Sequence, residues 1–440
     1  MSAGDPVAHF REVAATHERC FWLDGGGARE WSGTRSLVGA LAPDDVSLTY
    51  SAATREVRRH VDGRAEVVGD DVFTVLEAEL AAGRPADQWF GYLGYACRPD
   101  LPARPAGPTV DPAVDAAETD VPDAVWMRPS RVRLFEHGLA RPAHPTSVRA
   151  EPGRSPGNEV PDAYRRAFDR VQEHLHAGNT YETNLTYRRE VRSDLDPVSA
   201  YLRLRTLNPA PYAGFLQHDV TTVPGARAWL LSSSPERYAL VDADGGIETK
   251  PIKGTTPRGA TPATDAALRH RLATDPKFRA ENLMIVDLLR NDLAMVCEPG
   301  SVVVSSLMQV ESYPSVHQLV STVRGRLRPG VTTVGALRAL FPAGSMTGAP
   351  KLRTMQVVAE VEDTPRGAYS GAFGWLSADG RADLGVVIRS LSTTGDGRYR
   401  LGTGGGITVA SDVDSEAAEA ALKAERLLRV FDSPGVGSRD

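Results

Sequence analysis

The chain has 440 residues, of which 41% are hydrophobic and 24% charged, as is ordinary for a globular protein. The formal charge of −6 leaves no basic excess for binding nucleic acid. The 3 cysteines form no CxxC motif, which excludes a disulfide framework or zinc site, and no stretch approaches the ~18 apolar residues of a membrane helix. The N-terminus shows no apolar signal core, so we expect a cytoplasmic protein with neither nucleic-acid nor membrane partners.

The first part of the chain mixes helical and strand-like segments. Helices are predicted over residues 7–18 and 70–82, the second because its apolar residues fall on one helical face. The run SLTYSA at residues 47–52 is typical of a strand. These segments predict a region that combines helices and strands.

Two proline-rich stretches, residues 99–112 and 141–161, interrupt this pattern. Both contain too few apolar residues to pack well, so we expect exposed connections. We therefore predict an N-terminal region of residues 1–150, a linker at 151–162 and a second domain over 163–435.

The second domain combines many strand-like runs with a few long helices. Helices are predicted over residues 164–178, 276–296, 334–341, 350–361 and 412–431. Strand-like runs lie between them, among them TYETNLTYRREV, WLLSSSPERYALV, KPIKGTTPR, VHQLVSTVRGRL, GAFGWLS, DLGVVIRSLS and YRLGTGGGITVA. Because these strands follow one another without regular βαβ alternation, the pattern favours a mixed, largely antiparallel α+β domain.

Two predicted helices carry carboxylates that could bind a metal ion. Asp275 is the expected N-cap of helix 276–296, and Glu281 lies on the apolar face of that helix. Glu416 and Glu419 share a face of helix 412–431. One glutamate from each helix, with waters and a substrate carboxylate, would suit Mg²⁺. Taken alone, the spacing in helix 412–431 is more typical of a solvated Glu–Lys pair, because Lys423 follows Glu419 by four residues.

Two glycine-rich segments resemble nucleotide-binding loops without matching them. LGTGGGITV at 401–409 does not fit GxGxxG, and FPAGSMTGAPKL at 341–352 does not fit the P-loop pattern. Each is a tight turn or a backbone cradle for a carboxylate. The absence of GxSxG and GxCxG argues against a serine hydrolase or a built-in glutaminase.

Arg389 and Lys253 are the two cations that stand out. Arg389 is expected within the apolar strand VVIRSL, where its guanidinium needs either an anionic ligand or an internal ion pair. Lys253 lies in ETKPIKGTTPRG, a segment stiffened by Pro251 and Pro257. Taken alone, a lysine in such a loop is usually solvated.

Taken together, these runs resemble the chorismate-utilising enzymes, which include anthranilate synthase large subunits, aminodeoxychorismate synthases and isochorismate synthases. The matching runs span about residues 160–430, and include SSSPERYAL, ETKPIKGTTPRG, AENLMIVDLLRNDL, FPAGSMTGAPKLRTM and GTGGGI…SDVDSEAAEAALK. The resemblance implies antiparallel sheets packed in a sandwich and flanked by helices, with residues 1–150 contributing to the same sandwich. It also implies a Mg²⁺-dependent reaction of chorismate.

The resemblance carries residue roles over to this sequence by position. It implies that Glu281 and Glu419 bind Mg²⁺, with Glu416 acting through water. Glu236 is similar to the general acid beside the leaving hydroxyl, whose pKa burial should raise. The groups that hold the substrate are implied to be Thr255, Ser345, Tyr369, Arg389, Gly405, Gly406 and Lys423.

The run PIKGT, which contains Lys253, resembles the corresponding run of the aminodeoxychorismate synthases. This branch of the family aminates chorismate at C4. In that branch a lysine amine adds at C2 and expels the C4 hydroxyl, and ammonia then adds at C4 and expels the lysine. The amine must be neutral to attack. We expect burial and the nearby cations Lys250 and Arg258 to lower its pKa.

Glu182 stands where isochorismate synthases place a lysine that activates water, so the resemblance disfavours attack by water and groups Glu182 with the catalytic residues. Ammonia is expected from a separate glutaminase subunit. Two alternatives remain open: amination at C2, which gives anthranilate or 2-amino-2-deoxyisochorismate, and a non-catalytic subunit that binds chorismate. The sequence leaves open whether the product leads to para-aminobenzoate and folate or to an antibiotic.

Overall fold

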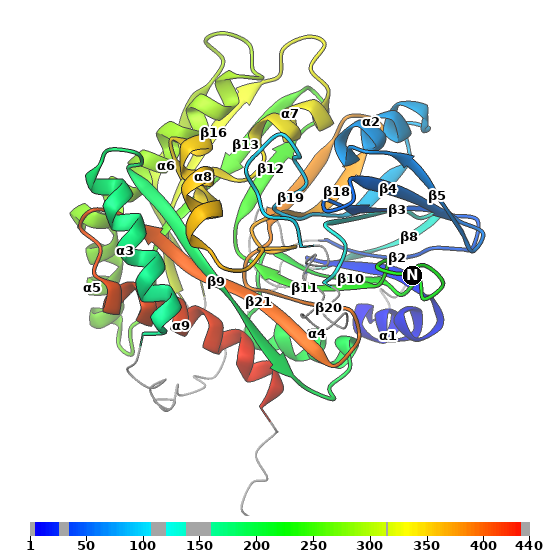
Figure 1. Cartoon of the computed structure of the whole chain (residues 1–440), viewed down its shortest axis with the longest axis horizontal. Helices are drawn as coiled ribbons and strands as arrows, with labels where there is room; N and C mark the ends of the chain where they lie inside the picture. The colour runs from blue at the N-terminus through cyan, green and yellow to red at the C-terminus, as the bar shows by residue number, and fades with distance from the viewer. Residues whose placement is uncertain (1–4, 26–34, 107–119, 138–159, 314–315, 433–440) are drawn as a thin grey trace, which may run out of the picture.

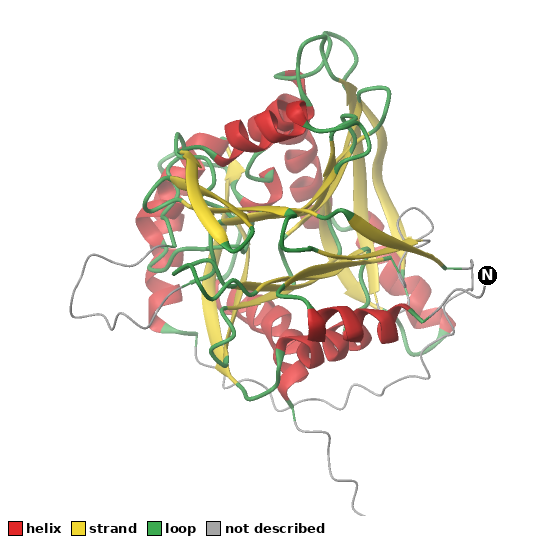
Figure 2. Ribbon diagram, turned by 90° about the vertical axis from the view of Figure 1, so that its right-hand side faces the viewer, coloured by secondary structure: helices red, strands yellow, loops and turns green. Residues whose placement is uncertain are grey.

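Two antiparallel β-sheets form the centre of the molecule, and helices lie around them (Figure 1 and Figure 2). The computed structural model describes residues 5–25, 35–106, 120–137, 160–313 and 316–432. The predicted α+β class, with antiparallel sheets in a sandwich flanked by helices, is confirmed.

Every strand pairing in the described residues is antiparallel. The first sheet has 9 strands in the order β17 Gly348–Ala349, β9 Glu182–Arg192, β21 Arg398–Ile407, β20 Ser390–Thr393, β11 Ala228–Ser234, β10 Tyr212–His218, β1 Arg19–Asp24, β2 Arg35–Ala40 and β8 Arg131–Glu136. The second has 12 strands: β14 Ile252–Pro257, β16 Val316–Arg326, β13 Gly246–Lys250, β12 Arg237–Val241, β19 Ala382–Val386, β18 Ala372–Ser377, β6 Gln88–Leu93, β7 Ala124–Arg128, β3 Val46–Ser51, β4 Glu56–Val61 and β5 Arg64–Gly69, with β15 Val303–Ser312 paired to β16.

The described helices alternate irregularly with these strands along the chain. They are α1 Pro6–Thr16, α2 Val72–Ala82, α3 Asp162–His176, α4 Pro197–Leu207, α5 Pro262–Thr274, α6 Pro276–Ala294, α7 Thr333–Leu340, α8 Lys351–Val361 and α9 Val413–Leu428, with short 3₁₀ turns η1 Gly344–Met346 and η2 Arg429–Phe431. In the part of the chain that the structure describes, no helix is long and apolar enough to span a bilayer.

Strands from the first 136 residues join both sheets. Strands β1, β2 and β8 extend the first sheet, and β3 to β7 extend the second. Most of the predicted linker at 151–162 lies outside the described residues, so the domain boundaries remain a prediction.

Aromatic residues fill the space between the two sheets. Phe21 of β1 stacks on Phe90 of β6, with ring centroids 4.0 Å apart. Leu216, Leu230 and Phe373 pack around this pair and are buried. Burying such side chains stabilises each by about 1.5–3 kcal/mol, so this layer holds the two sheets together.

The helix that carries Glu281 begins where the sequence predicts. Asp275 caps α6 by accepting a hydrogen bond from the backbone N–H of Lys277 at 2.9 Å, and Pro276 occupies the first helical turn. Ile285 and Leu289 bury the apolar face of this helix. Because this face packs on strands of the second sheet, Glu281, one turn before Ile285, also lies on the side of the helix that faces the sheet.

Candidate functional site

A cavity of about 330 Å³ lies where β14, α6, α9 and the glycine-rich end of β21 meet. All the residues predicted for the site except Glu182 line it: Glu236, Lys253, Thr255, Glu281, Ser345, Tyr369, Arg389, Gly405, Gly406, Glu416, Glu419 and Lys423. Figure 1 shows α9 running beside β21. The helices that carry the carboxylates, α6 and α9, are far apart in the sequence. The structure therefore brings both predicted carboxylate helices to one cavity.

A distortion in β14 directs Lys253 into this cavity. Gly254 has a φ of +90°, and the pairing of β14 with β16 shifts register between Ile252 and Thr255. A Cβ at Gly254 would approach Leu272 and Phe278 to 2.9 and 3.0 Å, so only glycine fits there comfortably. The side chain of Lys253 is 12% exposed and not solvated as a loop lysine would be.

Lys253 forms a buried ion pair with Glu182, the first residue of β9. The ammonium of Lys253 donates to Oε1 of Glu182, whose side chain is only 2% exposed. Burial lowers the pKa of Lys253, but Glu182, Glu281 and Glu236 raise it more, so the net shift is above the ordinary value. The ligand-free protein therefore holds this amine as an ammonium.

The expectation that Lys250 and Arg258 lower the pKa of Lys253 is wrong. Lys250 forms an ion pair with Glu311 at 2.8 Å, and Arg258 forms one with Asp265 at 2.7 Å. Both cations are thus neutralised by partners of their own, and carboxylates surround Lys253 instead.

The three predicted metal ligands project from α6 and α9 with lysines between them. Nζ of Lys277 lies 3.3 Å from Oε1 of Glu416 and 4.0 Å from Oε1 of Glu281. Nζ of Lys423 lies 2.9 Å from Oε1 of Glu419. Burial raises the pKa of Glu281 to about 7, against the opposing effect of Lys253. The carboxylate of Glu281 would therefore gain from an additional nearby cation.

Across the described residues, no three His, Cys, Asp or Glu side chains are grouped so as to enclose a metal ion on their own. A site with fewer protein ligands still fits, because Mg²⁺ commonly takes one or two carboxylates and completes its shell with waters and substrate oxygens. The partly buried Glu281 and the half-exposed Glu419 supply oxygens of the kind that Mg²⁺ prefers.

Arg389 does not lie within a strand, contrary to the prediction. It occupies the bend between β19 and β20, with a φ of 51° in the left-handed region. Burial, together with the charge of Arg426, lowers the pKa of Arg389 to about 10. No carboxylate within the described ranges forms an ion pair with Arg389, so the internal ion pair that the sequence left open is not found, and an anionic ligand fits this corner of the cavity.

Hydroxyl and glycine positions complete the lining of the cavity. Ser345 donates a hydrogen bond to Oε1 of Glu236 at 2.7 Å, and Glu236 itself is buried. Lys423 donates to the carbonyl of Gly404 at 2.9 Å. The ring of Tyr369 packs on Gly402, where any Cβ would clash with it.

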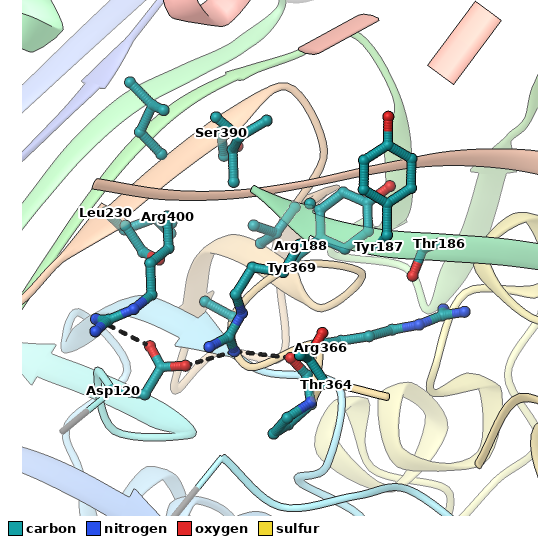
Figure 3. Close-up of a pocket in the computed structure, with 17 residues that line it drawn as sticks. Asp120, Thr186, Tyr187, Arg188, Leu230, Thr364, Arg366, Tyr369, Ser390 and Arg400 are labelled. Carbon is teal, nitrogen blue, oxygen red and sulfur yellow. Dashed lines mark hydrogen bonds and ion pairs between the residues drawn. The ribbon is translucent and has the colours of Figure 1, made fainter. Parts of the chain in front are cut away.

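A second, narrow cavity of about 20 Å³ lies behind Tyr369 (Figure 3). Asp120 accepts from Arg188 at 2.6 Å and lies 3.8 Å from Arg400. The charged residues around this small cavity are therefore paired, and its volume suits about one water molecule. We interpret this cluster as support for the strands beneath Tyr369.

Sequence reasoning missed two groups of residues. Lys277 and Arg426 line the cavity but were not singled out, although Lys277 precedes Glu281 by one helical turn. The buried pair of Glu362 and Arg366 was also missed. Arg366 donates to the carbonyls of Met346 at 2.6 Å and Asn184 at 2.8 Å, which ties η1 to strand β9.

The chain is similar in sequence and in fold to known proteins. A family model described as chorismate binding enzyme matches residues 18–429. The chain is 39% identical to an aminodeoxychorismate synthase of Streptomyces pristinaespiralis, over 99% of this chain and 64% of that protein. It is 43% identical to aminodeoxychorismate synthase component 1 of Klebsiella aerogenes, over 62% of this chain and 58% of that protein. It thus spans less than two thirds of the length of either relative. Anthranilate synthase component I of Streptococcus pneumoniae shares the fold, with a TM-score of 0.71, 24% identity, and coverage of 90% of this chain and 92% of that one.

Proposed function

Because the chain belongs to the family of chorismate-binding enzymes, we propose that it is a Mg²⁺-dependent enzyme that aminates chorismate at C4 and releases 4-amino-4-deoxychorismate. The names of the two relatives support this choice within the family. The observation that carries it is the position of Lys253, which lies inside the cavity beside acidic groups instead of in solvent. Once it has lost a proton, an amine held there can react with a bound ring.

The charges of the cavity suit a dicarboxylate substrate. Chorismate carries one carboxylate on its ring and a second on its enolpyruvyl side chain. Arg389 lacks an ion-pair partner among the described residues, and Gly405 and Gly406 line the same cavity. Thr255 and Tyr369 supply further hydroxyl groups. We assign the two substrate carboxylates to these groups and to Lys423.

The proposed chemistry divides one difficult substitution into two easier steps. The neutral amine of Lys253 bonds to C2 of the ring while the C4–O bond breaks, and Glu236 donates the proton with which the hydroxyl leaves as water. Ammonia then bonds to C4 while the bond between C2 and Lys253 breaks. The hydrogen bond from Ser345 keeps Glu236 oriented toward the cavity.

Mg²⁺ would be held by Glu281 and Glu419, with Glu416 acting through water. When bound, it supplies positive charge that neutralises a substrate carboxylate. The partly buried carboxylate of Glu281, whose pKa is raised to about 7, supports the presence of such a cation. The half-exposed Lys277 and Glu419 leave the α6–α9 side of the cavity accessible to it.

Ammonia would come from glutamine through a separate glutaminase subunit. The sequence carries no GxCxG motif, and the name of the Klebsiella relative as component 1 supports a partner component. Which biosynthetic route uses the product stays open.

A second candidate function is direct amination at C2. The protonated state of Lys253 in the ligand-free protein favours it, because an ammonium cannot attack carbon and ammonia could react at C2 instead. Incubation of the purified protein with chorismate, Mg²⁺ and an ammonium salt distinguishes the two functions. We expect 4-amino-4-deoxychorismate by mass spectrometry, whereas anthranilate as the sole product would refute C4 amination.

A further inference from the structure

We propose that Glu182 takes the proton from Lys253 when the amine becomes a nucleophile, and returns it once the amine is released. The inference rests on the proposed function, since it concerns the step in which Lys253 attacks the ring. It assigns to Glu182 a task in proton transfer that goes beyond the exclusion of water.

The first support is the contact itself. Glu182 is the carboxylate that hydrogen-bonds the ammonium of Lys253 in the described part of the chain. The two other carboxylates whose charges act on Lys253 have different contacts, because Glu236 accepts from Ser345 and Glu281 lies next to Lys277. A proton that leaves Lys253 therefore has a direct path to Glu182 and to no other described carboxylate.

The second support is the surroundings of Glu182. Its side chain is 2% exposed, and its Oε2 is buried without a hydrogen-bond partner among the described residues. The oxygen without a partner leaves this carboxylate an open position for a proton beside the ammonium of Lys253. Glu182 is thus suited to hold a proton while Lys253 is bonded to carbon.

The third support is Gly406 on the neighbouring strand. Glycine occupies this position of β21, opposite Asn184 of β9. A Cβ at Gly406 would clash with Oε1 of Glu182 and lie 3.0 Å from Nζ of Lys253. The strand therefore leaves room for the pair of side chains together, which indicates that the site is built around the pair.

The protons balance over the whole reaction. First, a proton moves from Lys253 to Glu182, so that Lys253–NH₃⁺ and Glu182–COO⁻ become Lys253–NH₂ and Glu182–COOH. The neutral amine then bonds to C2, and the C4 hydroxyl leaves as water with the proton of Glu236. Ammonia then displaces Lys253, which leaves as a neutral amine and recovers its proton from Glu182. The new ammonium at C4 gives one proton back to Glu236. Chorismate and ammonia are consumed, and 4-amino-4-deoxychorismate and water are formed.

The test compares the wild type with Glu182→Gln, which keeps the shape of the side chain and removes its charge. Substrate-free protein is treated with acetic anhydride across a range of pH, and peptide mass spectrometry follows acetylation of Lys253. We expect the pH midpoint of Lys253 acetylation to fall in the variant, with a rate near neutral pH at least about tenfold higher, since one pKa unit changes the neutral fraction tenfold. Glu311→Gln is the matched control. It removes the carboxylate that pairs with Lys250 at 2.8 Å, and neither residue lines the cavity.

A second readout follows catalysis. In Glu182→Gln we expect kcat for amination to fall at least about tenfold with KM nearly unchanged, as for loss of a group that transfers a proton. An unchanged pH midpoint for Lys253, or an unchanged kcat, overturns the role of Glu182. Failure of the proposed function is recognised separately by the wild-type product, since anthranilate overturns C4 amination whatever the acetylation shows.

Discussion

Ser345 and Glu236 are joined by a hydrogen bond of 2.7 Å from the serine hydroxyl to the carboxyl oxygen Oε1. The bond connects η1 to the segment that precedes β12, and both side chains line the cavity. A carboxyl group so held faces the cavity in one orientation, as is required of a group that protonates a leaving hydroxyl.

Replacing the proposed acid should slow the chemical step without weakening binding. For Glu236→Gln we expect kcat for amination to fall by about 10²–10⁴, the usual contribution of a positioned acid, with KM within a few-fold of the wild type. Steady-state assays with an ammonium salt as nitrogen donor measure both constants. Ser345→Ala should cause a smaller loss, because the acid remains present. Wild-type kcat in Glu236→Gln would contradict this role.

Gly406 should tolerate no side chain. Gly406→Ala adds a methyl group that clashes with Glu182, so we expect amination to fall at least about tenfold and the reactivity of Lys253 toward acetic anhydride to change. For Lys253 reactivity, Gly405→Ala is the matched control, because its Cβ would meet Oε2 of Glu416 at 3.5 Å and Nζ of Lys423 at 3.7 Å, ordinary contact distances. Equal Lys253 reactivity in the two variants would argue against a site shaped around the pair.

Lys277 should compete with the metal ion. Its ammonium lies near both Glu281 and Glu416, where a divalent cation would sit among the same carboxylates. We expect Lys277→Met to bind Mg²⁺ about threefold to tenfold more tightly, given the repulsion between charges a few ångströms apart near a surface. Titration calorimetry of the substrate-free protein measures the affinity, and Arg279→Gln on the same helix serves as control. Weaker Mg²⁺ binding by Lys277→Met would contradict the competition.

Two buried histidines should make the fold sensitive to acid. Burial lowers the pKa of His60 to about 4 and that of His218 to about 3, from an ordinary value of 6.5. As pH falls, these histidines therefore bind protons in the unfolded chain before they do so in the folded one. They do not change the free energy of unfolding above pH 6.5, and they lower it as pH falls from 6.5 toward the lowered pKa values. Together they account for a slope of at most about 2.7 kcal/mol per pH unit, since each proton contributes about 1.36.

Urea unfolding across this pH range measures the effect. Asp123, with a pKa raised to about 6 by burial, acts in the opposite direction, so the comparison must be made against a variant. We expect His60→Asn with His218→Gln to show a shallower loss of unfolding free energy on acidification than the wild type. Parallel curves would refute the assignment.

The sequence predicted those features that depend on local rules. The cap at Asp275 and the run of α6 follow from capping residues and side-chain patterns. Gly405, in a segment expected as a tight turn or a carboxylate cradle, instead lies within strand β21. Helix α4 was missed although Asp196 and Pro197 mark its start, because its neighbours read as strands. Helix α5 was missed because it buries only Leu272 and so lacks an apolar face.

The surroundings of Lys253 could not be predicted from its neighbours in sequence. Lys250 and Arg258 are close along the chain, but the strands and their bulge send them to other partners. Glu182 is 71 residues away from Lys253 and reaches it only because β9 and β14 meet at the cavity. Electrostatics at such a site depend on tertiary contacts, which spacing does not encode.

The central claim is that the amine of Lys253 bonds to the ring. The most direct measurement is incubation of the protein with chorismate and Mg²⁺ without ammonia, followed by intact and peptide mass spectrometry. We expect an adduct on Lys253 with the mass of chorismate less one water, which disappears when ammonium is added and is absent from Lys253→Ala. Undiminished amination by Lys253→Ala, with no adduct on the wild type, would contradict the account.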